Sequence, residues 1–274
     1  MRIQCAWIVL ATFFCGTSAS AFEFKVKGSV RKSLSDDSLR SSKNAANVSI
    51  VEPHENRLLS YKGLPFNDLM DQTIGKSWRD AEEVLFTCAD GYQPSIPVEK
   101  FKRFKAWLVW TRADGKPFQI TNKLQGNEQV RLGPFYLVWE NDHNEELLND
   151  GADDFPYQVV SVDLISFKDK FAKLAPPAGS QVTDGFLLYR KYCMKCHTLN
   201  GEGGGKGPEL KSMDFVSDKQ RAAVKRWILA PQDIKKGTTM PAFAPKLKDR
   251  DHQADKILEY LGRMTARDAR VAPL

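Results

Sequence analysis

The chain has 274 residues, more than one small domain needs, so its length predicts two domains. Its formal net charge is +6, from 40 Lys and Arg against 34 Asp and Glu. Beyond the N-terminal segment, no apolar run approaches the roughly 20 residues of a membrane-spanning helix, which excludes a transmembrane segment in the mature chain.

The N-terminal segment has the pattern of a secretory signal. Arg2 supplies a short positive stretch, an apolar stretch follows over about residues 6–15, and an A-x-A cleavage site ends at Ala21. We therefore expect a signal peptide over residues 1–21, cleavage after Ala21 and a periplasmic protein. Nucleic acid is not an expected partner of such a protein.

Residues 22–174 read as a β-rich domain. Short runs of β-branched and aromatic residues, bounded by turn residues, predict strands at 47–51, 83–87, 106–110, 135–139 and 157–162. Residues 65–72 predict one short helix. The segment at about 32–46, rich in Ser, Asp and Asn, predicts a loop.

A segment with two prolines, a glycine and a serine follows this domain. Residues 175–181 (APPAGSQ) predict a short, stiff linker and hence a domain boundary. Beyond it, apolar residues at helical spacing predict helices at 182–192, 218–229 and 252–264. The expected fold class is α+β, with a mixed β-rich domain at 22–174 followed by an all-α domain at 182–274.

Several segments of the first domain carry a family resemblance. Tyr61 to Met70 (YKGLPFNDLM) is similar to the Y-x-G-x-P-L-x-x-L-L element of the sulfite oxidase family's molybdopterin-binding fold. Phe86 to Tyr92 (FTCADGY) resembles its D-G-Y segment, Gly133 to Trp139 (GPFYLVW) its G-x-P-x-R-L-V stretch, and residues 157–167 its closing strand. The resemblance covers about residues 48–167 and implies that fold.

Departures from the family's pattern bear on the cofactor. The family places its molybdenum-ligating cysteine upstream of the Y-x-G-x-P element, but residues 22–60 contain no Cys. Cys88 lies elsewhere, and Tyr136 stands where the family has arginine. A pterin pyrophosphate needs cationic and backbone donors, which we do not find in the short upstream region. We therefore expect the fold without molybdopterin, as a docking or scaffolding module.

The remaining candidates of this domain have ordinary interpretations. Cys88 is the one Cys outside the signal peptide and the C-x-x-C-H motif. We expect it to be a buried, small hydrophobic residue, and a reactive thiol is the alternative. His54 and His143 are expected in exposed loops. These three residues would bind copper only if the fold brought them together. Asp90 and Tyr92 are expected to hold a turn.

The most specific motif of the chain is Cys193-Met194-Lys195-Cys196-His197. Its C-x-x-C-H pattern is that of a c-type haem attachment site. Two thiols one helical turn apart add to the two vinyl groups of one porphyrin, and the histidine places an imidazole under the iron. The C-x-x-C part alone would also fit a redox disulfide or half of a zinc site. The adjoining His197 favours one haem on Cys193 and Cys196.

A second axial ligand is expected after a glycine-rich segment. Residues 201–210 (GEGGGKGPEL) would let the backbone approach a flat cofactor closely. Met240 follows in TTMPAF, where its thioether suits haem iron and the proline after it fixes the loop. A core role for Met240 is the alternative. Met213 and Met264 lack the flanking proline.

These elements together resemble a class I monohaem cytochrome c. The resemblance runs from Gly185 to Met264 and includes an N-terminal helix, the C-x-x-C-H motif, the Gly-Pro-Glu-Leu loop, a W-I-x-x-P element, the M-P-A-F loop and a closing helix at 255–264. It implies one covalent haem c, with His197 and Met240 as axial ligands, and a role in electron transfer.

The positive charge is concentrated in the second domain. Residues 178–274 hold 18 Lys and Arg against 11 Asp and Glu, whereas residues 22–177 hold 21 against 23. A basic face around the haem would steer an acidic redox partner in the periplasm or inner membrane. A solvated, lysine-rich surface is the alternative.

The leading hypothesis is an electron carrier rather than an enzyme. The haem would pass one electron at a time, and the first domain would select the partner. One alternative is a haem-linked molybdenum oxidoreductase acting on a substrate such as sulfite, a layout that exists in the family the first domain resembles. Another is a sensor or assembly factor whose first domain binds a small ligand or metal while the haem reports redox state. Molybdenum content tests the first alternative, and a ligand-dependent haem potential tests the second.

Overall fold

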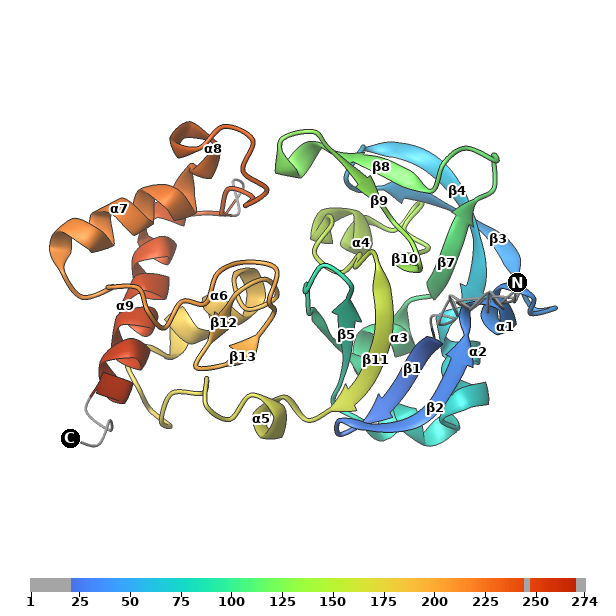
Figure 1. Ribbon diagram of the computed structural model, residues 1–274, viewed down its shortest axis with the longest axis horizontal. Coiled ribbons are helices and arrows are strands. Elements are labelled where there is room, and N and C mark those ends of the chain that lie inside the picture. The colour runs from blue at the N-terminus through green and yellow to red at the C-terminus, as the bar shows by residue number, and fades with distance from the viewer. Residues whose placement is uncertain (1–20, 244–246, 270–274) are drawn as a thin grey trace, which may run out of the picture.

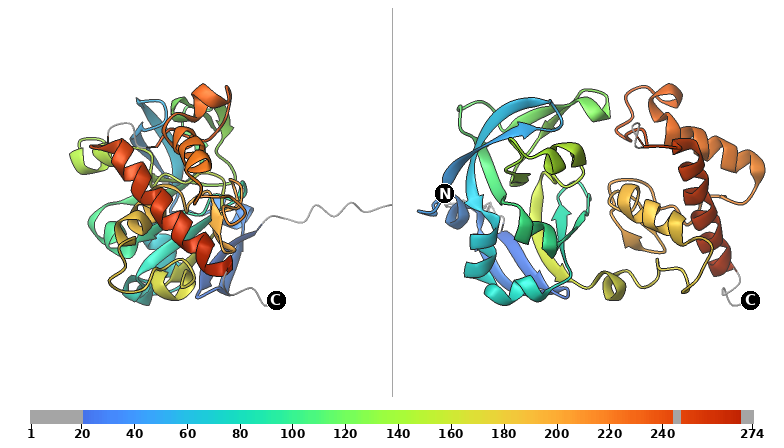
Figure 2. Two further views of the ribbon diagram at one scale, coloured as in Figure 1. Left: turned by 90° about the vertical axis from the view of Figure 1, so that its left-hand side faces the viewer. Right: turned by 180° about the vertical axis from the view of Figure 1, so that it is seen from behind.

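The computed structural model describes residues 21–243 and 247–269, with side chains described as far as residue 266. Residues 1–20 of the expected signal peptide lie outside the described residues. Within the described part of the chain, no helix is long and apolar enough to cross a membrane. A β-rich region and a helical region lie side by side, and the segment between them runs along one edge (Figures 1 and 2).

The β-rich region, residues 21–174, is built on two main sheets. The five-stranded sheet has the order β2-β1-β11-β5-β6. Its strands are β1 (Ala21–Val26), β2 (Ser29–Ser35), β5 (Glu83–Cys88), β6 (Ser95–Pro97) and β11 (Val159–Ile165). The four-stranded sheet has the order β10-β7-β4-β3. Its strands are β3 (Ala46–Glu52), β4 (Arg57–Pro65), β7 (Ala106–Arg112) and β10 (Tyr136–Trp139).

The remaining elements of this region are short. A separate hairpin is formed by β8 (Gln119–Asn122) and β9 (Glu128–Arg131). The helices are α1 (Asp36–Arg40), α2 (Phe66–Thr73), α3 (Val98–Arg103), α4 (Glu145–Asp150) and α5 (Phe167–Lys170), with 3₁₀ turns η1 (Lys76–Asp80) and η2 (Lys123–Gln125). Pro65 ends β4 and caps α2. Because proline cannot donate to a ladder, the chain leaves the sheet there.

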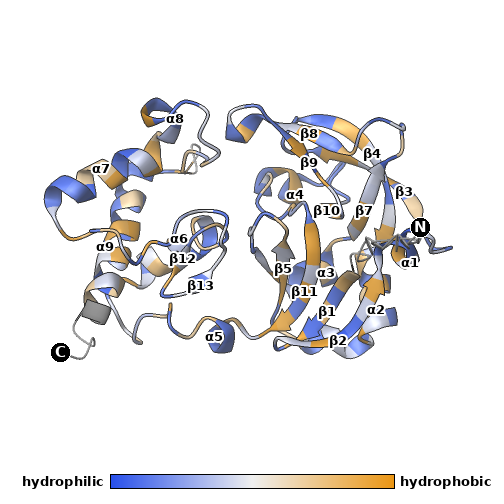
Figure 3. Cartoon of the chain, viewed as in Figure 1, coloured by the Kyte–Doolittle hydropathy of each residue, from blue (hydrophilic) through white to orange (hydrophobic). Residues whose placement is uncertain are grey.

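Aromatic rings fill the core of the β-rich region. Phe66, Phe101 and Trp139 are at most 1% exposed, and the ring centroids of Phe66 and Trp139 each lie 4.9 Å from that of Phe101. Offset and tilted ring contacts add stability beyond the area they bury. The strand β11 is buried along nearly its whole length, and Figure 3 shows it as mostly hydrophobic.

The strand predictions hold for this region, but the predicted loop at 32–46 does not. The predicted strands coincide with parts of β3, β5, β7, β10 and β11. The predicted loop contains the end of β2 and all of α1. Among the described strands, β2 pairs only with β1. It is almost entirely exposed, so it lacks the alternation of apolar residues that would have revealed it. The Ser35 hydroxyl caps α1 by accepting the Ser38 N–H at 3.2 Å.

The helical region contains α6 (Thr183–Tyr192), α7 (Asp218–Leu229), α8 (Pro231–Ile234) and α9 (Arg250–Ala269). The prediction of an all-α domain is wrong in one detail. β12 (Thr198–Leu199) and β13 (Glu202–Gly203) form a two-residue ladder after His197. α6 and α9 pack directly against each other. Gly185 on α6 has no space for a Cβ beside the Lys256 carbonyl, so glycine permits this close crossing.

The core of the helical region extends into the β-rich region. It includes Leu85 of β5, Ile165 of β11, and three residues at the end of the β-rich region, Phe167, Phe171 and Leu174. The Tyr260 hydroxyl donates to the Leu174 carbonyl at 2.8 Å. The two regions therefore share a packed boundary.

Candidate functional site

The C-x-x-C-H motif directly follows α6, and its backbone continues as hydrogen-bonded turns. The Cys193 N–H donates to the Tyr189 carbonyl at 2.8 Å, which caps the helix. The Cys193 carbonyl in turn accepts the N–H of Cys196 at 3.1 Å and of His197 at 2.9 Å. These hydrogen bonds wind the motif into a compact turn, so both thiols and the imidazole come from one short stretch of backbone.

A second loop fixes the imidazole of His197. Its Nδ1 lies 2.9 Å from the Pro208 carbonyl oxygen. Because a carbonyl only accepts, Nδ1 must carry the hydrogen, which leaves the Nε2 lone pair for a metal. Sequence reasoning did not find this partner. The Gly-Pro pair after the motif is the signal that could have pointed to it.

Glycines in this loop make room for the motif itself. A Cβ on Gly207 would lie 2.5 Å from His197 Cε1 and 2.7 Å from its Nδ1. Cβ atoms on Gly203 and Gly204 would collide with the carbonyls of His197 and Lys195. These glycines let the loop lie directly against the C-x-x-C-H turn, and their approach to a flat cofactor stays a prediction.

Met240 lies in a loop that is tied to the helices around it. Its N–H donates to Thr238 Oγ1 at 3.3 Å, and the Gln232 side chain of α8 donates to the Thr238 carbonyl. Phe243 is buried, and its N–H donates to the Ile228 carbonyl of α7 at 2.9 Å. Its ring meets the ring of Tyr192, next to the motif, edge-on at 5.1 Å.

The methionines differ in burial. Met264 is 4% exposed within α9 and belongs to the core. Met240 and Met213 are both partly buried against the same core cluster. Burial alone therefore leaves both of them as candidates, and the proline that follows Met240 still distinguishes it.

The thiols of the motif do not resemble a reactive redox pair. Burial raises the pKa of the Cys193 thiol to about 12 and that of the Cys196 thiol to about 11. Redox-active C-x-x-C motifs depend on a lowered pKa that keeps one thiolate available near neutral pH. The environment therefore argues against a thioredoxin-like role.

A comparison with protein families agrees with this geometry. The model of the family described as cytochrome C oxidase, cbb3-type, subunit III matches residues 180–261. The chain has a C-terminal cytochrome c domain. Such a domain binds haem c. A comparison with curated proteins gives no match. The family match does not extend to the β-rich region, so the resemblance of that region to the sulfite oxidase family stays a prediction.

The residues of the cytochrome c domain fit haem c. Two adjacent thiols can form thioethers, and His197 has the tautomer that ligation through Nε2 requires. Gly207 leaves the imidazole its space, and a thioether sulfur is available on the Met240 loop.

A turn of the β-rich region lies directly against the C-x-x-C-H motif and the loop at residues 203–208, which are together called the haem loop here. The Gly205 N–H donates to the Gly91 carbonyl, and the Gln93 N–H to the Lys195 carbonyl, both at 2.8 Å. A Cβ on Gly91 would lie 2.8 Å from the Gly205 carbonyl carbon, so the two backbones are in contact. The turn that contains Gly91 therefore helps to hold the C-x-x-C-H segment in place.

Ion pairs surround this contact. Three cations of the cytochrome c domain pair with carboxylates of the β-rich region. Lys206 pairs with Asp90 at 2.8 Å, Lys195 pairs with Asp154 at 3.6 Å, and Arg190 pairs with Glu83. Part of the basic charge that was expected to attract an outside partner is therefore neutralised by carboxylates of the same chain. Asp90 also holds its turn, as expected, by accepting the Tyr92 N–H at 3.0 Å.

The expectations for the other candidates of the β-rich region have mixed outcomes. His143 is 93% exposed, as expected. Cys88 is 2% exposed, and burial raises its pKa well above the ordinary value, as befits a small hydrophobe. The exposed loop expected for His54 is wrong, because its side chain is 6% exposed and its Nδ1 lies 2.6 Å from the Glu52 carboxylate. Across the described residues, no group of three or more His, Cys, Asp or Glu side chains could hold a metal.

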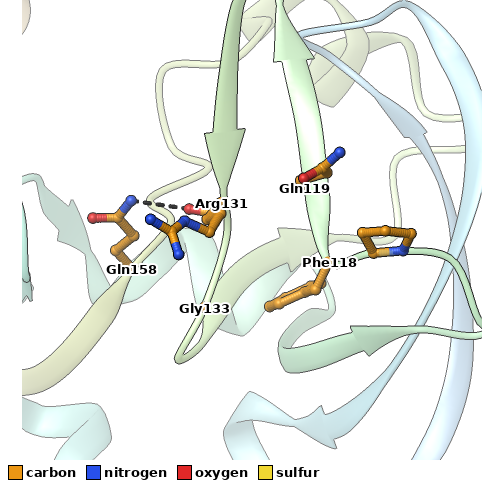
Figure 4. A pocket seen from close by; sticks show the side chains of 6 residues that line it. Phe118, Gln119, Arg131, Gly133 and Gln158 are labelled. Carbon is orange, nitrogen blue, oxygen red and sulfur yellow. Dashed lines mark hydrogen bonds between the residues drawn. The ribbon is translucent and has the colours of Figure 1, made fainter.

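An open hollow on the β-rich region lies outside the matched cytochrome segment (Figure 4). It is lined by Pro117, Phe118, Gln119, Arg131, Gly133 and Gln158. The Gln158 side chain donates to the Arg131 carbonyl at 2.9 Å and closes one side of the hollow. The hollow has one guanidinium, and it lacks the set of cationic donors that a pterin pyrophosphate needs.

Proposed function

We propose that this protein is a periplasmic c-type cytochrome that carries single electrons through one covalently bound haem. Cys193 and Cys196 would attach the haem, and His197 and Met240 would be its axial ligands. The observation that carries the proposal is the C-x-x-C-H turn whose histidine has Nδ1 bound to the Pro208 carbonyl, within a segment that matches a cytochrome c family.

The bound haem would supply one-electron chemistry between Fe(III) and Fe(II). The chain's contribution is to position and tune it. The Pro208 carbonyl orients the His197 ring and makes it a stronger ligand, and a methionine thioether raises the iron potential. With His197 and Met240 both bound to the iron, the haem would be suited to electron transfer rather than to binding oxygen or peroxide.

In this proposal the β-rich region is a separate, cofactor-free domain that serves partner docking, with the boundary at residues 175–181. The contacts of its Asp90–Gln93 turn with the cytochrome c domain support this role, because they join the region to the haem loop. The outside partner would be an oxidoreductase in the periplasm or inner membrane. Delivery would depend on the signal peptide predicted over residues 1–21.

The molybdenum-to-iron ratio of protein matured in a bacterial periplasm tests the proposal. Iron near one per chain, held covalently and without molybdenum, is the expected result. Molybdenum near one per chain would instead indicate a haem-linked oxidoreductase, such as a sulfite dehydrogenase. A haem potential that shifts when a ligand or metal binds the β-rich region would indicate a sensor. Protein without covalent haem would contradict all three functions.

A further inference from the structure

A buried carboxylate in the β-rich region is bound by the side chains of three residues, and it also accepts the backbone N–H of His54 at 3.2 Å. Glu52 at the end of β3 is fully buried, and its carboxylate accepts the hydroxyls of Tyr61 (2.9 Å) and Tyr136 (3.1 Å to each oxygen). The third donor is His54, with Nδ1 at 2.6 Å. Within the described chain, no Lys or Arg forms an ion pair with Glu52. A charged carboxylate is costly to bury without a positive partner, and His54 is the neighbour that can supply one.

Contacts on the other side of His54 lead to the haem loop. The ring of His54 meets the ring of Tyr157 edge-on, with centroids 5.9 Å apart. The Tyr157 hydroxyl accepts from the Lys206 ammonium at 3.1 Å, and Lys206 pairs with Asp90 at 2.8 Å. The residue after Lys206 is Gly207, the glycine that lies against the candidate iron-ligating imidazole. The buried pair is therefore linked to the haem loop through packed side chains.

The tyrosines around this pair keep their protons near neutral pH. Burial raises the pKa of Tyr61, Tyr136 and Tyr157 above the ordinary value for a phenol. Their hydroxyls can therefore donate hydrogen bonds, but they do not release protons in the range where a histidine titrates.

The other charged groups near His54 have partners of their own. Glu55 pairs with Arg57 and accepts the Thr121 N–H at 2.6 Å. The Lys123 ammonium donates to the Glu55 carbonyl at 2.9 Å, and the Lys123 N–H donates to the His54 carbonyl at 3.3 Å. Arg112, which also acts on Glu55, pairs with Asp114 at 2.6 Å. Among the charged groups named here, Glu52 is the carboxylate whose neighbouring base is a histidine rather than a lysine or an arginine.

We propose that the His54–Glu52 pair takes up one proton from solvent when the haem iron accepts one electron from its redox partner. The electron makes the haem more negative by one charge, and the proton adds one positive charge to the pair. Oxidation returns the electron to an acceptor and the proton to solvent. The coupling is electrostatic, because charges interact more strongly across a packed interface than through water. It rests on the proposed function, since it requires a haem at the C-x-x-C-H motif.

Redox titration of the full-length haem protein from about pH 5 to 9, the range around the histidine titration, tests the proposal. The haem midpoint potential is expected to fall as pH rises, because proton uptake accompanies reduction. His54→Gln should lose this slope. His143→Gln is the matched control, an exposed histidine of the same region, and should keep it. A pH-independent potential in the wild type, or an unchanged slope in His54→Gln, overturns the proposal.

A second measurement does not depend on how the variants fold. The chain has four histidines, so the ring of His54 can be assigned by NMR and titrated in the wild-type protein. Its titration midpoint is expected to be higher in the reduced protein than in the oxidised protein. Equal midpoints in the two redox states overturn the coupling even if haem is present. Absence of covalent haem from the absorption spectrum would instead count against the proposed function.

Discussion

The β-rich region and the cytochrome c domain differ in how completely their helices and strands are buried. In the β-rich region, β5 buries five of its six residues and β11 six of its seven. In the cytochrome c domain, α9 buries six of its described residues, but α7 buries only Ile228 among its twelve. Met213, Val224 and Met240 pack against the core there but stay partly exposed.

This difference indicates how each part depends on what it binds. A core of close-packed side chains is formed by the chain alone. A domain with a thinner core gains more of its stability from a bound group, because binding to the folded form alone shifts the folding equilibrium. We therefore expect the β-rich region to fold without a cofactor and the cytochrome c domain to depend on its haem.

The largest effect is expected from removing the attachment thiols. Cys193→Ser combined with Cys196→Ser should abolish covalent haem completely, because no thioether can form. Haem staining after denaturing electrophoresis measures this loss. Limited proteolysis should then cut the cytochrome c domain first and leave residues 21–174 protected.

Cys88→Ala provides the control for this experiment. Cys88 is buried in the β-rich region outside the motif, so the variant should keep its covalent haem. Covalent haem in the double variant, or its loss in Cys88→Ala, would assign the attachment to different residues. Equal proteolysis of both regions would contradict the difference between the cores.

Met240→Ala is expected to have the next largest effect. It should remove the weak near-infrared absorption band of a methionine-ligated ferric haem. It should also lower the potential by on the order of 0.2 V, within the roughly 0.8 V that axial ligands span. Met213→Ala is the matched control, since Met213 is also partly buried against the same core but lacks the flanking proline. A band that survives in Met240→Ala and disappears in Met213→Ala would transfer the ligand assignment to Met213.

The sequence predicted those parts of the fold and the site that depend on local patterns. The amphipathic pattern of residues 218–229 predicted α7 with its bounds, and the C-x-x-C-H spacing predicted a turn that brings two thiols and an imidazole together. Both features are set by residues close in sequence, whose spacing matches one period of a helix or turn.

Features that depend on distant contacts were not predicted. His54 lies among polar and charged residues, which indicated an exposed loop, yet Tyr136 and Tyr157 enclose it from far along the chain. The pairing of Asp90 with Lys206 joins two regions whose sequences carry no signal of each other. The exposed strand β2 lacks the alternation that would reveal a strand.

A smaller effect is expected from Gly207→Ala. The added Cβ would press on the His197 ring, and overpacking of this kind costs about 1–3 kcal/mol of unfolding free energy. Thermal unfolding measures the cost, and the His197 ring resonances of the reduced protein report whether the imidazole moves. Gly205→Ala is the matched control in the same loop, because its Cβ would meet open space. Equal losses in both variants would contradict a specific contact between Gly207 and the imidazole.

The smallest expected effect is an acid dependence of the contact between the two regions. The Asp154 carboxylate lies 2.7 Å from the Lys100 ammonium and 3.6 Å from that of Lys195. Burial raises its pKa, but Lys195 and Lys100 outweigh burial and hold the pKa of Asp154 below the ordinary value. For an acid with a lowered pKa, the stabilisation is complete above its unfolded-state pKa of about 4 and is lost as pH falls through the folded-state pKa.

The amides of Gln93 and Gly205 form hydrogen bonds across the boundary, so their hydrogen exchange reports on this contact. Their protection, corrected for the intrinsic exchange rate, should be constant from neutral pH to about pH 4. In stronger acid the contact should loosen by about 1 kcal/mol or less, as for a partly exposed ion pair. Asp154→Asn should show the loosened contact already at neutral pH. Asp142→Asn, on the exposed loop beside His143, should match the wild type. Loosening that begins near pH 6 in the wild type would assign the acid sensitivity to a histidine instead of Asp154.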